Sequence, residues 1–298
     1  MQKQKIKMQN GKLNFKKMMR LYIIVSILSF QILASGCATY KTQVTQKLSW
    51  EDTSSLLRNV QGDVKNLSRQ QITENLILNS SKIATLRANI DITLTTPDAK
   101  APLRCNGLIL YQNPNHLRAM GSKLATTLFD IYSDERKFYL YIPIENKVYT
   151  GSSNAFHKIE VLGINIFPGD MAYLFNHREI LEGYNPVIET WPFYWLLHLM
   201  EAKETNINLK GNLLIDRINA DVFRCELFEP DGAVRLQILF TNYVSMAGGR
   251  VPQRIDVRWP KYDTTLNIIF SDVILNKKLD PKVFSFAKSE GAEVITLD

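Results

Sequence analysis

The most restrictive feature of the sequence is a long succession of short segments in which apolar and polar residues alternate. Each segment ends at a cluster of turn residues, such as Pro97-Asp98, Asn113-Pro114-Asn115 or the hairpin signal Asp231-Gly232. Short alternating segments separated by turns are typical of an antiparallel meander. The sequence therefore predicts one antiparallel sheet of about eleven strands. The predicted strands span residues 86–94, 103–111, 116–121, 126–132, 137–142, 147–150, 205–214, 222–228, 234–243, 254–259 and 265–274.

Helical patterns precede and interrupt this series of strands. Ser49-Trp-Glu-Asp52 has the pattern of a capping box. It is followed at helical spacing by an apolar stripe consisting of Leu57, Val60, Val64 and Leu67. A second helix is predicted over residues 69–79. Residues 164–175 predict a turn into a helix, with Pro168 and Gly169 near its start. The apolar stretch 190–200 predicts a helix or a lid segment.

A single twisted antiparallel sheet of this size must curl. Its concave face must then be filled by side chains, covered by helices or occupied by a ligand. The helices at 49–80 and 164–200 are the candidates to cover it. The predicted fold class is mostly β with helices: an open antiparallel half-barrel of about eleven strands with a helical plug or lid.

The first forty residues have the pattern of a lipoprotein export signal. A basic start is followed by the apolar run 21–34 and then by Ala34-Ser35-Gly36-Cys37, which resembles the lipobox of bacterial lipoproteins. The resemblance implies cleavage before Cys37, diacylglycerol on its sulfur and a fatty acyl group such as palmitate on the new amine. Two or three such chains anchor a protein stably, since each buried CH₂ contributes about 0.8 kcal/mol.

The signal also predicts the domain organisation and the location. We expect a signal peptide over residues 1–36, a lipidated tether over residues 37–48 and a folded domain over residues 49–298. Ala38, and not Asp, follows the cysteine, which under the enterobacterial sorting rule predicts the outer membrane. The expected location is the cell envelope, lipid-anchored at the periplasmic face of the outer membrane.

The net charge of +7 does not point to a nucleic-acid partner. Residues 1–36 hold seven of the 36 Lys and Arg residues and none of the 29 Asp and Glu residues, so the remainder of the chain is balanced. The basicity belongs to the signal peptide, and the predicted domain carries no field that would attract phosphates. We therefore expect no nucleic-acid binding.

The order of helix, six strands, helical break and further strands resembles the LolA/LolB superfamily of lipoprotein carriers and outer-membrane receptors. The closing segment has that family's pattern of Leu-Asp-Pro-x-x-Phe-x-Phe and then Gly-x-x-Val, and Asp134 precedes an aromatic-rich strand over residues 138–141 as in the family. The matching closing residues are Leu279, Asp280, Pro281, Phe284, Phe286, Gly291 and Val294. The resemblance implies a cavity for acyl chains. It also implies three kinds of partner: the membrane through the N-terminal lipid, the acyl chains of lipoproteins or phospholipid, and a soluble carrier protein.

No residue pattern for catalysis, metal or cofactor binding is present. The four histidines, His116, His157, His177 and His198, lie on separate segments without metal-ligand spacing. Nucleophile elbows, phosphate loops and dinucleotide motifs are missing. We expect no enzyme activity, no metal and no cofactor. Cys105 and Cys225 permit either a disulfide or two buried thiols that pack as small apolar groups.

An aromatic and aliphatic set is the candidate lining of the cleft or its lid. Its members are Phe129, Ile131, Phe138, Leu140, Ile142, Phe175, Trp191, Phe193, Trp195 and Leu196. The first hypothesis is an anchored lipoprotein that binds acyl chains of lipoproteins or lipids and acts in lipoprotein localisation to the outer membrane. The alternative is a structural envelope-assembly lipoprotein with a filled core that binds a protein partner. The content of the cleft discriminates between the two.

Overall fold

The computed structural model divides into two compact units, residues 1–58 and 59–298, and every residue that it describes belongs to the second. The predicted signal peptide, Cys37, the tether and the helix expected from Ser49 lie outside the described residues and stay predictions. The described residues are 62–134, 136–153, 158–161, 164–175, 177–181, 184–203, 206–285 and 290–297.

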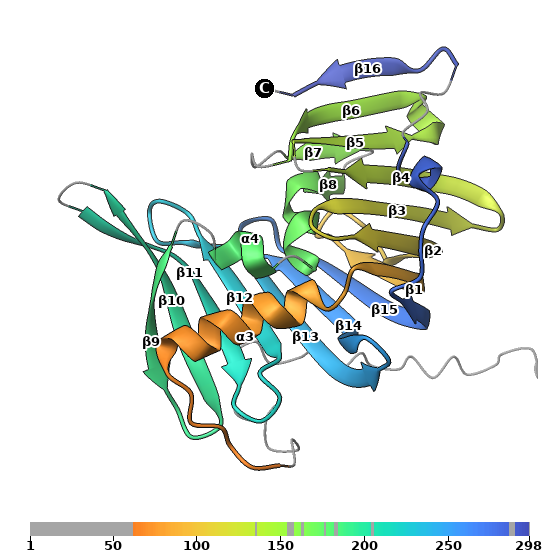
Figure 1. The fold of residues 1–298 in the computed structure, drawn as a ribbon. Helices are drawn as coiled ribbons and strands as arrows, with labels where there is room; N and C mark the ends of the chain where they lie inside the picture. The colour runs from red at the N-terminus through yellow and green to blue at the C-terminus, as the bar shows by residue number, and fades with distance from the viewer. Residues whose placement is uncertain are drawn as a thin grey trace, which may run out of the picture. The chain divides into compact units, whose positions relative to one another are not determined.

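One large, open sheet dominates this unit (Figure 1). Its fourteen strands follow the order β16-β6-β5-β4-β3-β2-β1-β15-β14-β13-β12-β11-β10-β9, and β7 pairs with β8 in a separate two-stranded sheet. All pairs are antiparallel except β16 with β6. The two ends of the order, β16 and β9, do not pair, so the sheet does not close.

The structure gives the strands the following bounds. The large sheet consists of β1 (Thr85–Thr95), β2 (Leu103–Gln112), β3 (His116–Lys123), β4 (Thr126–Ser133), β5 (Lys137–Ile142), β6 (Lys147–Ser152), β9 (Asn185–Thr190), β10 (Tyr194–Lys203), β11 (Asn206–Asp216), β12 (Val222–Phe228), β13 (Val234–Met246), β14 (Gly249–Trp259), β15 (Thr264–Leu275) and β16 (Glu293–Thr296). The small sheet consists of β7 (Ile159–Val161) and β8 (Ile164–Ile166).

The predicted mostly-β, open antiparallel fold is confirmed, but the strand count was too low. The described residues contain sixteen strands where the sequence predicted about eleven. The prediction of a helix or lid over residues 190–200 was wrong, because most of this stretch is β10, hydrogen-bonded between β9 and β11. Trp195, Leu197 and Leu199 are buried and the residues between them are half-buried. A strand that is apolar on both faces lacks the alternation that identifies strands in sequence.

Helix α3 (Arg69–Ser81) begins at a capping box. The Ser68 Oγ accepts a hydrogen bond from the backbone N–H of Gln71, and the Gln71 side chain accepts one from the backbone N–H of Ser68 at 2.9 Å. Ile72 and Leu76, one turn apart, are the buried residues of the helix. The predicted second helix is thus confirmed. Val64 and Leu67, expected in the first helix, lie in the non-helical segment before the cap.

The remaining helical segments are short. They are η1 (Pro143–Glu145), η2 (Pro168–Leu174), α4 (His177–Leu181), η3 (Pro260–Tyr262) and η4 (Pro281–Phe284). The helix expected within residues 164–175 is therefore strand β8 followed by the 3₁₀ segment η2, with Pro168 at its start as predicted. Residues of α3, η2 and α4 join the main core cluster, so all three pack on the same face of the sheet, which we call the inner face.

The opposite, outer face of β2 to β5 is covered by a C-terminal strap, residues 277–285. Phe284 packs there with Leu110 and Tyr132 in a second small core. The carboxylate of Asp280 caps η4 by accepting the Lys282 N–H at 3.0 Å, with Pro281 at the first helical position. The Leu-Asp-Pro-x-x-Phe pattern is therefore a turn that fastens the strap, while Phe286 lies outside the described residues.

We expect Phe284→Ala to weaken the fold by detaching the strap. Truncating a buried Phe costs about 3–5 kcal/mol, and Phe284 is buried. Urea unfolding followed by circular dichroism measures the loss. The control Ile144→Ala, at a side chain that is mostly exposed, should change stability by less than about 0.5 kcal/mol. Equal midpoints for the two variants would show that the strap contributes nothing.

Candidate functional site

The inner face of the sheet is the candidate functional site. Alternate residues of every long strand point to it, as shown by the buried series Leu86, Ala88, Ile90 and Ile92 in β1. The register places further buried aliphatic residues beside one another on β10 to β14. One such row consists of Leu197, Leu213, Cys225, Ile238 and Val257. The result is one continuous apolar surface across the sheet, which requires a cover to be stable in water.

A plug formed by residues 167–181, that is Phe167 with η2 and α4, supplies part of this cover. Phe175 stacks on Tyr111 of β2 with ring centroids 5.2 Å apart and meets Phe270 of β15 edge-on at 6.1 Å. Phe167 stacks on Trp259 at 4.7 Å. The plug therefore contacts β2, β14 and β15 through aromatic rings. These contacts are apolar, so another apolar group could take the place of the plug side chains.

One polar cluster fastens the plug to the sheet. The Asp170 carboxylate in η2 accepts hydrogen bonds from Arg235 Nη1 of β13 at 2.5 Å and from Trp259 Nε1 of β14 at 2.8 Å. Asp170 is only 5% exposed. Burial raises the pKa of Asp170, while the Arg235 charge and the two donors lower it. We call these three residues the latch. Removing one partner of a buried ion pair costs about 3–5 kcal/mol of stability, so the latch holds the plug firmly on the sheet.

His177, the first residue of α4, is a second polar group in the plug. Its ring meets Phe240 of β13 edge-on at 5.2 Å between centroids. The Nε2 atom is buried and has no hydrogen-bond partner among the described residues. Burial lowers the pKa of His177 from 6.5 to about 4, so the imidazole is neutral at pH 7.

The structure brings together most of the residues proposed from the sequence. Five of them are buried in the inner-face core: Ile131, Phe138, Leu140, Ile142 and Trp195. Phe129 and Phe175 are half-buried and pack against the same core. Leu196 is half-buried and follows Trp195 in the strand, so it points to the outer face.

Trp191 and Phe193 do not belong to this set. They lie in the turn between β9 and β10 and are 45% and 53% exposed, respectively. Sequence reasoning also missed the latch. Arg235 alternates with apolar neighbours in a predicted strand, and nothing in the sequence connects it with Asp170, 65 positions away. The buried aliphatic residues of β11 to β14 could have been predicted as part of the inner face, because the alternation that predicted those strands also identifies them.

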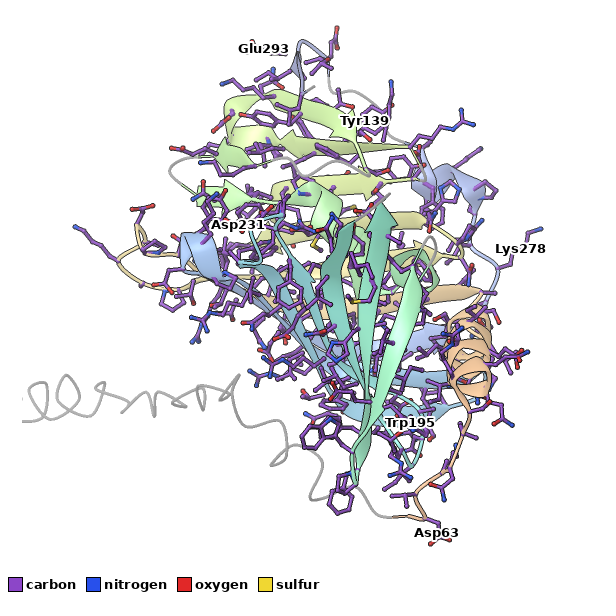
Figure 2. The ribbon with its side chains drawn as sticks, turned by 90° about the vertical axis from the view of Figure 1, so that its left-hand side faces the viewer. Asp63, Tyr139, Trp195, Asp231, Lys278 and Glu293 are labelled. Carbon is purple, nitrogen blue, oxygen red and sulfur yellow. The ribbon has the colours of Figure 1, made fainter. Side chains whose placement is uncertain are left out.

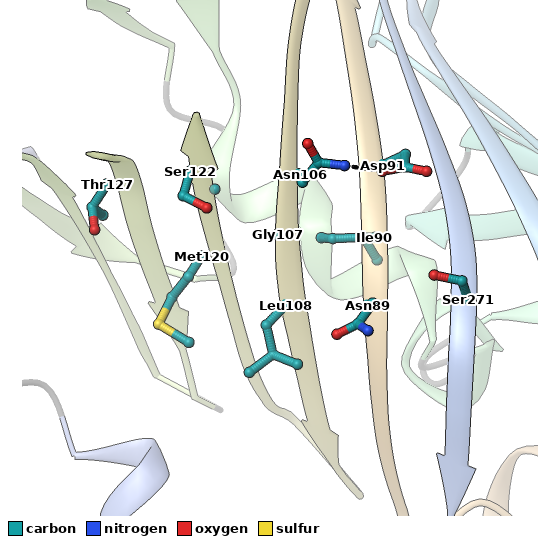
Figure 3. Close-up of a pocket in the computed structure, with 11 residues that line it drawn as sticks. Asn89, Ile90, Asp91, Asn106, Gly107, Leu108, Met120, Ser122, Thr127 and Ser271 are labelled. Atoms are coloured by element: carbon teal, nitrogen blue, oxygen red, sulfur yellow. Dashed lines mark hydrogen bonds between the residues drawn. The ribbon is translucent and has the colours of Figure 1, made fainter. Parts of the chain in front are cut away.

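The outer face carries a pocket of different character (Figure 3). Its volume is about 550 Å³, and it extends over β4, β3, β2, β1 and β15. The side chains that line it are mostly polar: Asn89, Asp91, Asn106, Ser122, Thr127 and Ser271, with Leu108 and Met120. Asn106 Nδ2 of β2 donates a hydrogen bond to the carboxylate of Asp91 on the neighbouring strand β1. This polar surface does not suit an acyl chain, which favours the inner face as the site for one.

Other candidate groups have structural partners. Cys105 and Cys225 are free, and burial raises the pKa of both thiols. Of the two alternatives, a disulfide or two thiols, the structure therefore shows two thiols, one on β2 and one on β12. His198 contacts Asn212 through Nδ1 at 2.8 Å and Glu189 through Nε2 at 3.1 Å. In the described part of the chain no three His, Cys, Asp or Glu residues group as metal ligands. Its helices are also too short or too polar to cross a bilayer.

Solved structures share this architecture. A LolA superfamily protein from Nitrosomonas europaea aligns over 74% of this chain and 99% of its own, at 16% identity and a TM-score of 0.50. A putative outer membrane lipoprotein-sorting protein domain from Vibrio parahaemolyticus aligns over 73% and 97%, at 13% identity and a TM-score of 0.52. A DUF1329 family protein from Desulfovibrio piger aligns over 72% and 96%, at 10% identity and a TM-score of 0.53.

These likenesses define the class of fold. The chain has a LolA-like fold, an open antiparallel sheet with its inner face plugged by helical segments, as the closing-segment pattern predicted. Protein-family models give no match to the chain, and neither do curated protein sequences. The likeness is therefore one of fold.

We expect the stability of the protein to fall as the pH falls from about 6.5 to about 4. In this window the unfolded chain binds a proton at His177 that the folded chain does not, so the stabilisation present above pH 6.5 is lost on acidification. The loss is at most about 3 kcal/mol at 1.36 kcal/mol per pKa unit. It is smaller where solvent reaches the half-buried ring.

Urea unfolding of wild type and His177→Phe at a series of pH values measures this effect. The variant keeps the edge-on ring contact with Phe240 and lacks the titrating nitrogen. The stability difference between the two proteins should therefore change between pH 6.5 and 4. A constant difference across this range would show that His177 is not buried in its neutral form.

Proposed function

We propose that this protein is a membrane-anchored lipoprotein that binds acyl chains of lipoproteins or lipids at its inner face. The observation that carries the proposal is a continuous apolar sheet surface whose cover includes a plug that is held to the sheet by an ion-paired latch. The solved LolA superfamily protein and lipoprotein-sorting domain with this fold support it. Binding needs no covalent step, and the proposal assigns no catalytic residue.

Exchange of the plug for an acyl chain is feasible because it substitutes one apolar group for another. Burial of apolar area stabilises by about 25 cal/mol per Å² whichever group supplies the area. A chain that covers the surface now covered by Phe167, Leu174, Phe175, Ile180 and Leu181 restores the burial of the sheet surface that their withdrawal exposes. The polar latch is the part that an acyl chain cannot replace, so it sets the cost of opening.

The anchor and the location complete the proposal. Lipidation at Cys37 after removal of residues 1–36 would hold the domain at the membrane through the tether, with the periplasmic face of the outer membrane as the proposed location. In this reading the protein receives acylated cargo from a soluble carrier and acts in lipoprotein localisation.

The second candidate is a structural envelope lipoprotein that binds a protein partner. The observation in its favour is the complete burial of the inner-face residues, with Phe138 at 0% exposure. A permanently filled core leaves no room for an acyl chain. The contents of the inner face in the native protein decide between the two candidates.

Native mass spectrometry of the full mature lipoprotein, extracted gently from bacterial membranes, tests the proposal. We expect adducts of phospholipid or lipopeptide mass, and uptake of a fluorescent fatty acid by the delipidated protein. A clean protein mass together with no fatty-acid uptake would refute acyl-chain binding and favour the structural candidate.

We also expect removal of the latch to speed lipid exchange. The double variant Asp170→Asn, Arg235→Gln replaces an ionic hydrogen bond by a neutral one without leaving a single buried charge. Hydrogen bonds to charged groups contribute about 1.5–3 kcal/mol, so the plug should open more readily, and uptake of a fatty acid by the delipidated protein in stopped flow should accelerate about tenfold or more.

The matched control is Arg254→Gln, Asp256→Asn, which removes an ion pair of 2.8 Å within β14, away from the plug. Its rate of fatty-acid uptake should equal that of the wild type. Equal acceleration in both double variants, or in neither, would contradict a gating role of the latch.

A further inference from the structure

The turn between β9 and β10 carries large apolar side chains in an unusual position. Trp191, Pro192 and Phe193, which we call the aromatic tip, are all exposed. Trp191 lies parallel to Tyr194 with centroids 5.6 Å apart and donates from Nε1 to the Glu189 carboxylate at 3.2 Å. The tip thus presents an indole with a satisfied N–H beside a bare phenyl ring, outside the inner-face core.

The tip is held by a buried arginine. Arg217, in the turn between β11 and β12, is 8% exposed. Its Nη1 donates to the carbonyl oxygens of Trp191 at 2.8 Å and Pro192 at 3.1 Å, and its backbone N–H donates to the Phe193 carbonyl at 3.0 Å. Every residue of the tip is therefore bonded through its backbone to Arg217. Because the backbone of the tip is already fixed, its exposed rings can bind a partner without the entropic cost of ordering a loop.

The same arginine also fixes the point at which the chain enters the domain. Arg217 Nε donates to the Lys65 carbonyl at 3.1 Å, Nη2 donates to Asn66 Oδ1 at 2.5 Å, and the Lys65 N–H donates to the Arg217 carbonyl at 2.7 Å. Figure 2 shows Asp63 and Trp195, the latter beside the tip in sequence, at the same end of the sheet. The segment leading from Cys37 therefore reaches the domain next to the aromatic tip.

We propose that the aromatic tip is a membrane-contact site that seats in the interface of a glycerophospholipid bilayer. Trp and aromatic side chains concentrate at the boundary between headgroups and acyl chains. Of the charged residues, Glu189 accepts from the indole of Trp191, and Lys65 is joined to the tip through the backbone contacts of Arg217; one acidic and one basic residue favour a zwitterionic surface over an anionic one. The proposal rests on the proposed function in one respect, the lipid on Cys37.

This contact would orient the domain. The predicted tether, residues 37–48, spans up to roughly 40 Å when extended, at about 3.3–3.6 Å per residue. A lipid anchor on such a tether leaves the domain free to tumble. A second contact beside the entry point of the tether would hold this end of the sheet against the bilayer.

Quenching of tryptophan emission by brominated phosphatidylcholine tests the contact. The full mature lipoprotein is reconstituted into vesicles, with Trp50→Phe in every sample so that Trp191, Trp195 and Trp259 report. We expect strong quenching that is largely lost in Trp191→Phe and reduced in Phe193→Ser, in which Trp191 remains. Unchanged thermal unfolding midpoints show that both variants are folded.

Each result has a definite meaning. Equal quenching with and without Trp191, no quenching at all, or failure of the protein to float with the vesicles overturns the membrane contact and leaves the tip as a surface for a protein partner. Trp195 and Trp259 belong to the inner-face core. Quenching that remains in Trp191→Phe therefore reports acyl chains at the inner face, and its absence counts against the proposed function while the loss caused by Trp191→Phe still supports the tip.

Discussion

The rest of the structure depends on one constraint: a fourteen-stranded sheet that does not close leaves an apolar face that cannot be exposed to water. In a closed barrel the strands would fill this space from all sides. Here the cover comes from elements outside the sheet, namely α3 and the plug. Because the cover is not part of the hydrogen-bonded ladder, the proposed opening would break no strand pair of the large sheet. The strand pairing of the sheet and the cover of its inner face thus depend on different elements of the chain.

Under the proposed function, the polar groups of the plug would give this arrangement its selectivity. Apolar contacts such as Phe175 on Tyr111 can be replaced by any acyl chain of suitable length. The contacts of Asp170 with Arg235 and Trp259 have no equivalent in such a chain. Withdrawal of the plug would therefore cost more free energy when water replaces it than when an apolar ligand covers the inner face. On this view the latch keeps an empty site closed.

The sequence predicted those elements whose pattern is local. Strands β5 and β12 were predicted to the residue, because each alternates cleanly and is bounded by turn residues such as Asp231-Gly232. Helix α3 was predicted over residues 69–79 from a less regular apolar stripe, and the structure adds the capping box at Ser68. The sequence failed in two places. Strand β10 has mostly apolar residues on both faces and so lacks alternation, and β16 pairs in parallel with β6, which is far from it in the sequence. For the site, the aromatic strand Phe138–Ile142 could be predicted and the latch could not.

The most direct test of the account is hydrogen exchange of the backbone amides of the full protein, with and without bound lipid. The account predicts that loading with an acyl lipid lowers the protection of residues 167–181 while β11 to β14 keep theirs. Such a result would show the plug leaving an intact sheet. Unchanged or increased protection of the plug at saturating lipid would contradict the claim that plug and acyl chain compete for the inner face.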